Sequence, residues 1–115
     1  MSLRFSEVCI DADDIHALGQ WWASALGWPS SVTEDGDVLL RPPDGGPDWL
    51  FLAVPDGKVV KNRLHFDFTP DDQQAEVDRL IGLGARHVDI GQGDQTWVVL
   101  ADPEGNEFCV LAAGE

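Results

Sequence analysis

A length of 115 residues is enough for one ordinary hydrophobic core, so we expect a single domain spanning residues 1–115. Seven basic and 21 acidic residues give a net charge of −14, which repels phosphate backbones and anionic lipid headgroups. This charge argues against nucleic acid and membranes as partners. The acidic residues are dispersed along the chain, as is typical of a solvated surface.

The apolar residues are distributed as in a globular protein. They make up 43% of the chain, and no apolar run reaches the roughly 18 residues of a membrane span. Residues 1–7 lack the basic segment and apolar stretch of a secretory signal, so we expect a cytoplasmic protein. Cys9 and Cys109 fit neither a disulfide framework nor a zinc-binding spacing, and both lie in apolar runs. We expect two buried free thiols.

The first half of the chain predicts a strand, a helix and further strands. A β-forming run at residues 5–11 ends at Asp13-Asp14, which can cap a helix. Gly27 supplies the stop of that helix. Short apolar runs at residues 38–41 and 49–54 are separated by the turn-forming residues 42–47. The apolar stripe expected to face the core consists of Ile15, Leu18, Trp22 and Leu26.

The second half repeats this order. Residues 64–69 are strand-like, and Thr69-Pro70-Asp71-Asp72 provides a cap, a first-turn proline and acids suited to the helix dipole. The expected helix has an apolar face and stops at Gly84. Strand-like runs follow at residues 87–90, 96–101 and 107–111. The helix face is formed by Val77, Leu80 and Ile81.

The two halves align residue by residue as two βαβββ modules, at about residues 4–55 and 62–112. The order of the matches and their near-constant offset indicate an internal duplication. The matched pairs are Glu7 with His65, Asp13-Asp14 with Asp71-Asp72, Leu26-Gly27 with Leu83-Gly84, and residues 43–45 with 103–105.

Alternation along the strands separates an apolar face from a mixed face. Because alternate residues of a strand share a face, the mixed face receives the following sets: Glu7, Cys9 and Asp11; His65 and Asp67; Glu107, Cys109 and Leu111. If helices cover the apolar face, the mixed face lines a cavity, packs on a partner or faces water. We favour a ligand cavity.

Two stretches resemble a known superfamily. Residues 62–68 (NRLHFDF) and 97–109 (WVVLADPEGNEFC) are similar to the vicinal-oxygen-chelate superfamily, which includes glyoxalase I, extradiol dioxygenases and bleomycin-binding proteins. The resemblance covers essentially the whole chain and is greatest to glyoxalase-like domain proteins of the actinobacterial type. It implies an α+β fold in which two βαβββ modules form a cupped mixed or antiparallel sheet with helices on its outer face. It also implies a homodimer.

The resemblance also implies positions for a metal site. Metal-dependent members of the superfamily use four side chains, which here become Glu7, Leu52, His65 and Cys109. Leu52 has no donor atom, and Cys109 replaces a carboxylate. Glu7, His65 and Cys109 together can hold zinc with an open position, whereas oxygen-rich octahedral chemistry is disfavoured. A bound divalent metal is therefore the less favoured alternative.

Several residues are candidate ligand contacts, each with a structural alternative. Arg63 can clamp an anionic ligand or pair with a surface acid. Trp49 and Trp97 can form an aromatic wall or pack in the core. Asp67 and Leu52 lie on expected site strands, and for Cys109 a small buried hydrophobe is favoured over a nucleophile.

The residues leave open two main functions for a protein that binds a small molecule. One is a lyase or isomerase in which His65 or Glu7 moves a proton beside a carbonyl or enol, with or without a metal. The alternative is a non-catalytic protein of the bleomycin-resistance type, which sequesters a drug or metabolite and which the missing donor at Leu52 favours. A third reading is a module used mainly for protein interaction. A homodimer is compatible with all three.

Overall fold

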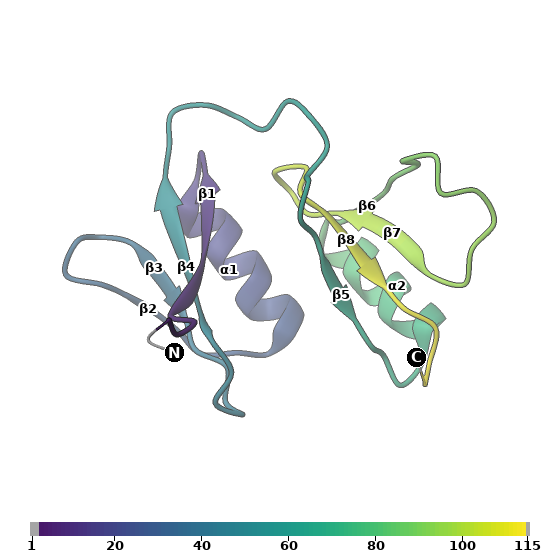
Figure 1. Ribbon diagram of the computed structural model, residues 1–115, viewed down its shortest axis with the longest axis horizontal. Coiled ribbons are helices and arrows are strands. Elements are labelled where there is room, and N and C mark those ends of the chain that lie inside the picture. Colours follow the sequence, from purple (N-terminus) through teal and green to yellow (C-terminus); the bar gives the residue numbers. More distant parts are fainter. Residues whose placement is uncertain (1–2, 115) are drawn as a thin grey trace. The chain divides into compact units, whose positions relative to one another are not determined.

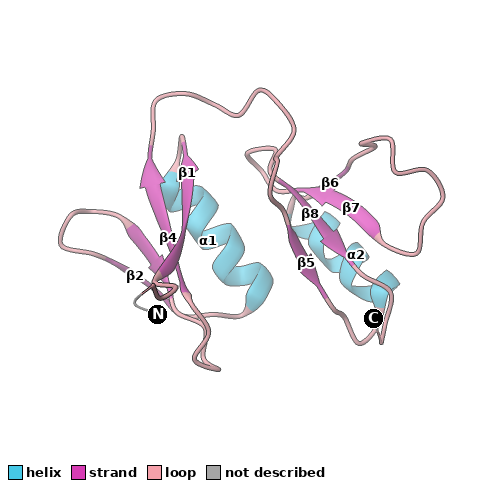
Figure 2. Cartoon of the chain, viewed as in Figure 1, coloured by secondary structure: helices cyan, strands magenta, loops and turns pink. Residues whose placement is uncertain are grey.

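The computed structural model describes residues 3–114 (Figure 1). Residues up to Gly57 form one compact unit, and residues from Lys58 form a second. Each unit contains one helix and one four-stranded mixed sheet in the order βαβββ (Figure 2). The predicted α+β class and the repeated order are therefore confirmed. Within residues 3–114, no helix is long and apolar enough to cross a membrane.

The first unit arranges its sheet in the order β1-β4-β3-β2. Strand β1 runs parallel to β4, and the other neighbours are antiparallel. The predicted strands at residues 5–11, 38–41 and 49–54 are present with shifted ends, and the edge strand β2 is short and exposed. The elements are β1 (Glu7–Ala12), α1 (Ile15–Leu26), β2 (Ser30–Val32), β3 (Val38–Leu40) and β4 (Asp48–Ala53).

The second unit repeats the topology in the order β5-β8-β7-β6, with β5 parallel to β8. Its strands are shorter than predicted: the runs expected at residues 64–69 and 87–90 contribute only β5 and β6. The helix packs against one face of the sheet (Figure 1). The elements are β5 (Phe66–Phe68), α2 (Gln73–Leu83), β6 (Arg86–His87), β7 (Val98–Ala101) and β8 (Glu107–Val110).

The two helices begin and end in the same way. Asp14 accepts a hydrogen bond from the Ala17 amide at 3.1 Å, and Asp72 accepts one from the Ala75 amide at 3.1 Å. Each helix stops at a left-handed glycine, with φ of 69° at Gly27 and 118° at Gly84. These equivalent caps support the aligned repeat.

One prediction about the second helix start is wrong. Thr69 was expected to cap the helix and Pro70 to occupy its first turn, but α2 begins at Gln73, immediately after Asp72. The carboxylate of Asp72 reaches the amide three residues ahead, as a capping residue must, and its own backbone is extended. Pro70 therefore lies in the connection that precedes the helix.

An aromatic cluster fills the core of the first unit. The Trp49 ring lies 5.4 Å from Trp22 of α1 and 5.3 Å from Trp28, centroid to centroid. Only 6% of Trp49 is exposed. The prediction of Trp49 as a ligand contact is therefore corrected, because strand alternation places its side chain with the buried Phe51 rather than with the half-buried Leu50 and Leu52. Of the predicted helix stripe, Ile15, Leu18 and Trp22 are buried and Leu26 is half-buried.

The core of the second unit lies between its sheet and α2. Phe108 is almost fully buried, and its ring lies 5.9 Å from that of Phe68. Helix α2 adds the buried side chains of Val77 and Leu80, whereas Ile81 is 36% exposed. The apolar face predicted for β5 and β8 is thus the face that packs in the core.

We expect Gly19→Ala to lower the free energy of unfolding by about 1–3 kcal/mol through overpacking. A Cβ at Gly19 would lie 2.6 Å from Cγ1 and 3.2 Å from Cβ of the buried Val38. Gly82→Ala in α2 is the matched control, because its Cβ meets nothing within 4 Å and alanine favours helix by about 0.5–1 kcal/mol. Urea unfolding measures both variants. Equal stability of the two would contradict this packing.

Candidate functional site

Three titratable side chains meet on the second sheet. His65 immediately precedes β5, Asp67 lies within it, and Cys109 of β8 is the register partner of Asp67. One ligand-type atom from each of the three lies within 4.8 Å of the others. We call this group the His65 cluster. Because Phe66 and Phe68 alternate with these residues, the cluster occupies the face opposite the aromatic core.

His65 and Asp67 form a direct pair. The Nε2 atom of His65 lies 3.1 Å from Oδ1 of Asp67, and their side chains are 44% and 49% exposed. A neutral imidazole that donates from Nε2 keeps an unprotonated Nδ1, which is a proton acceptor. The pair therefore has the form of an oriented general base that is accessible to a small molecule.

The Cys109 thiol is held in its protonated form. Burial raises its pKa to about 11, and the charge and hydrogen bond of Asp67 act in the same direction. The positive charge of Lys61 opposes this shift only in part. Cys109 is thus a neutral hydrogen-bonding group at pH 7, which agrees with the predicted buried free thiol and not with a nucleophile.

The other cysteine differs from expectation. Cys9 is exposed, so the prediction of a second buried thiol is wrong. Along β1 the residues Glu7, Cys9 and Asp11 are all exposed, whereas Val8 and Ile10 between them are half-buried. Cys9 therefore lies on the polar face that the strand alternation had indicated.

A partly buried ion pair fixes the segment that leads into the cluster. Lys58 Nζ lies 3.0 Å from Oε2 of Glu107, and the Asn62 amide donates to Oε1 at 2.8 Å. Burial raises the pKa of Glu107, but the Asn62 and Lys58 interactions outweigh it and leave the pKa below its usual value. Glu107 thereby joins residues 58–62 to β8. This segment ends three residues before His65.

The motif at residues 102–106 has a structural role. Asp102 is 1% exposed, and its Oδ1 accepts hydrogen bonds from the amides of Glu104 and Asn106 at 2.9 Å each. The Asn106 side chain donates to Oδ2 at 3.0 Å. Gly105 completes the turn with φ of 86°. This network sets the turn between β7 and β8 and so places Cys109.

The remaining candidates of the second unit lie in segments that lead into its strands. Trp97 is half-buried and immediately precedes β7. Val99 pairs with Cys109, and Trp97 lies two residues before Val99, outside the strand. Arg63 is exposed, two residues before His65.

The strand register changes the expected counterpart of Cys109 in the first unit. Glu7 and His65 are equivalent, and the next residues on their faces are Cys9 and Asp67. Cys9 pairs with Leu50, as Asp67 pairs with Cys109. Leu50 is therefore equivalent to Cys109. The assignment of Leu52 to that position is wrong by two residues along β4, because Leu52 pairs with Asp11. Neither leucine provides a donor atom.

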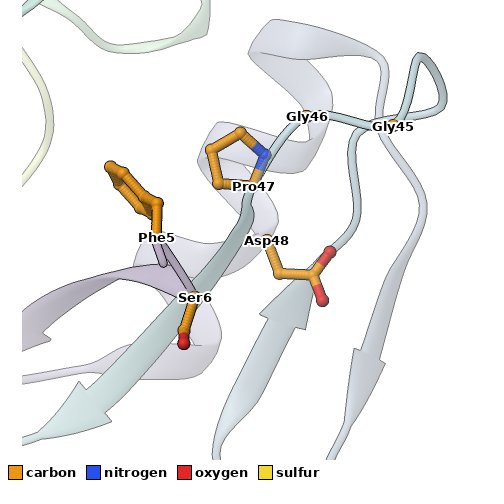
Figure 3. A pocket seen from close by; sticks show the side chains of 6 residues that line it. All are labelled: Phe5, Ser6, Gly45, Gly46, Pro47 and Asp48. Carbon is orange, nitrogen blue, oxygen red and sulfur yellow. The ribbon is translucent and has the colours of Figure 1, made fainter. Parts of the chain in front are cut away.

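Glu7 and a separate hollow belong to the first unit. Glu7 begins β1 and is exposed, and its pairing with His65 of the second unit remains a prediction. A hollow of about 470 Å³ is bounded by residues just before β1 and by the turn before β4 (Figure 3). Because it holds no predicted site residue, the hollow has no part in the candidate site. Its lining is Phe5, Ser6, Gly45, Gly46, Pro47 and Asp48.

The donor set fits the metal site of the superfamily poorly. His65 and Asp67 already bond to each other, and the third donor, Cys109, is a protonated thiol. Three such donors lack the oxygen-rich set preferred by nickel, iron or manganese, and a closed zinc site needs a fourth ligand. The position equivalent to Cys109 in the first unit offers none. We therefore derive no chemical step through a metal.

Two successive βαβββ units of this topology are typical of vicinal-oxygen-chelate proteins. Residues 7–111 match the family model of the glyoxalase-like domain, and the chain belongs to that family. No curated protein matches the sequence. The actinobacterial character suggested by the sequence remains a prediction.

Several solved structures share the fold at low sequence identity. The fosfomycin resistance protein FosX from Mesorhizobium loti is 12% identical, with a TM-score of 0.73 over 98% of this chain and 94% of that chain. A glyoxalase/bleomycin resistance protein/dioxygenase family enzyme from Burkholderia phytofirmans PsJN is 21% identical, with a TM-score of 0.69 over 91% and 94%. A bleomycin resistance determinant encoded on transposon Tn5 is 14% identical, with a TM-score of 0.63 over 98% and 100%. At these identities the likeness establishes the fold alone.

Sequence reasoning missed the interactions that organise the site. The His65 and Asp67 positions were placed on one face, but their direct bond was not predicted. The spacing of two residues along a strand was the available signal. The Lys58 and Glu107 pair joins residues distant in sequence, and no local sequence pattern predicts it.

Proposed function

We propose that the face of β5 and β8 binds a small molecule and that His65 transfers a proton on it, in a lyase or isomerase reaction beside a carbonyl or enol. The observation that supports this proposal is the His65 and Asp67 pair at 3.1 Å, open to solvent on the sheet. A histidine oriented by a carboxylate is a common general base. The proposal includes no metal.

Each residue of the cluster has a distinct role in this proposal. Nδ1 of His65 takes a proton from carbon, and Asp67 holds the ring and compensates for the charge that the ring gains. The neutral Cys109 thiol is a weak hydrogen-bond donor beside them. Trp97 offers an aromatic contact for the ligand. Glu7 remains the proposed second acid-base group, contributed by the first module.

A sequestering protein is the second candidate function. Leu50, at the position equivalent to Cys109, has no donor atom, and Cys109 is protonated, so donors are lost without preventing ligand binding. The structural likeness to a bleomycin resistance determinant is compatible with this function. Saturable binding without turnover would favour it. The sequence suggests a homodimer and a cytoplasmic location, and both are compatible with either function. The proposal that both modules form one domain is also compatible with either function.

Proton transfer can be tested by solvent exchange. Carbonyl compounds are incubated with the protein in D₂O, and loss of the α-proton signal is followed by NMR. We expect His65→Ala to slow exchange by at least about 100-fold, the usual contribution of a general base. His87→Ala removes an exposed histidine of the same unit and serves as the control. Equal exchange rates for His65→Ala and the wild type would refute the proposed role.

A further inference from the structure

The basic residues of the chain are concentrated beside the His65 cluster. Of seven basic residues in a chain of net charge −14, three lie within residues 58–63: Lys58, Lys61 and Arg63. They directly precede His65 at the entry to β5. In a chain with such an excess of acids, a local concentration of positive charge is unusual and marks this segment electrostatically.

The three cations have different environments. Lys58 is mostly buried and is neutralised by Glu107 at 3.0 Å, so it anchors the segment. Within residues 3–114, neither Lys61 nor Arg63 has a carboxylate partner. Lys61 donates to the backbone carbonyl of Asn62 at 3.1 Å. Two cations thus remain uncompensated on an anchored segment.

The segment lies close to the cluster, because the ion pair of Lys58 with Glu107 and two hydrogen bonds of Asn62 fix it there. The Asn62 amide and side chain donate to the side chain and the backbone carbonyl of Glu107, at 2.8 and 3.5 Å. Glu107 is two residues from Cys109 on β8. The charge of Lys61 is near enough to act on the Cys109 thiol. The charge of Lys61 therefore borders the face that holds His65 and Asp67, and Arg63 lies between Lys61 and His65 in the chain.

We infer that the ligand of this face carries an anionic oxygen group, a carboxylate or a phosphonate, which Lys61 and Arg63 bind beside His65. The inference rests on the proposed function in placing the ligand at the His65 cluster. Arginine binds such groups through two parallel hydrogen bonds, and lysine adds a compact charge. The acidic remainder of the surface repels anions, so this segment is the favoured place for one.

The test uses NMR titration of the full chain at low salt with acetate, methylphosphonate, acetamide and tetramethylammonium as probes. We expect saturable shifts at residues 58–67 and 107–110 with the two anions, and none with neutral acetamide, which has the shape of acetate. Comparison of acetate with methylphosphonate identifies the preferred anion. We expect the double variant Lys61→Gln with Arg63→Gln to weaken anion binding by at least about tenfold.

The matched control is Arg79→Gln with Arg86→Gln, which makes the same charge change elsewhere in the second unit. Equal weakening by both double variants, no saturable anion binding, or a preference for tetramethylammonium would overturn the inference. Anion binding that survives His65→Ala while solvent exchange is absent in the wild type would support the anion site and refute the proposed catalysis. Exchange that requires His65 without anion binding would do the reverse.

Discussion

Replacing Asp102 with alanine is expected to lower the free energy of unfolding by about 3 kcal/mol. The carboxylate is 1% exposed and accepts hydrogen bonds from two backbone amides and the Asn106 side chain. Alanine leaves these donors in a part-buried turn without their acceptor. The loss is large because hydrogen bonds to a charged group are stronger than neutral ones. Equilibrium unfolding in urea measures it.

Two further variants make the Asp102 prediction specific. Asp102→Asn keeps the size and one acceptor oxygen, so it should lose less stability than Asp102→Ala. Asp94→Ala removes an exposed acid of the same unit and should change stability by less than about 0.5 kcal/mol. If Asp102→Ala is as stable as Asp94→Ala, the turn does not depend on the Asp102 carboxylate.

The two cysteines are expected to differ in alkylation rate by at least about a hundredfold at pH 8. The Cys109 pKa of about 11 leaves about a thousandth of that thiol ionised, compared with roughly a quarter for an ordinary thiol with a pKa near 8.5. Burial of Cys109 adds steric protection, whereas Cys9 is exposed. Mass spectrometry after timed iodoacetamide treatment measures both sites.

Single-cysteine variants and pH separate the causes. Cys109→Ser leaves only the fast site, and Cys9→Ser leaves only the slow one. Because the pKa of Cys109 is raised, its rate should still increase tenfold per pH unit between pH 8 and 9. A Cys109 rate equal to that of Cys9, with a plateau near pH 9, would show an ordinary thiol and would reopen thiolate chemistry at this site.

The fold was predictable because the local signals agree with the tertiary structure. As predicted, Asp14 caps the start of the first helix, Gly27 ends it, and Gly84 ends the second helix. The prediction that Thr69 caps the second helix was wrong because threonine and aspartate are both common capping residues. Only the backbone conformation shows that Asp72 is the cap. Trp49 misled because a tryptophan on a strand can face either side, and its partner Trp28 lies in a loop beyond the helix.

The candidate site was predictable only in part. Two-residue alternation identified the face of His65, Asp67 and Cys109, since it depends on the backbone alone. The partly buried pair of Lys58 and Glu107 depends on how a connecting segment returns to β8. The misassigned leucine shows the same limit, because register is fixed by turns and pairing that composition does not specify.

The most direct test of the central claim is to map where a bound small molecule lies. A carbonyl compound that the protein binds saturably is titrated into ¹⁵N-labelled protein, and the amide shifts are assigned. We expect the largest shifts at His65, Asp67 and Cys109, with weakening in His65→Ala. Shifts confined to the exposed surface of α2, or to the hollow at Phe5 and Pro47, would contradict a ligand site on the β5 and β8 face.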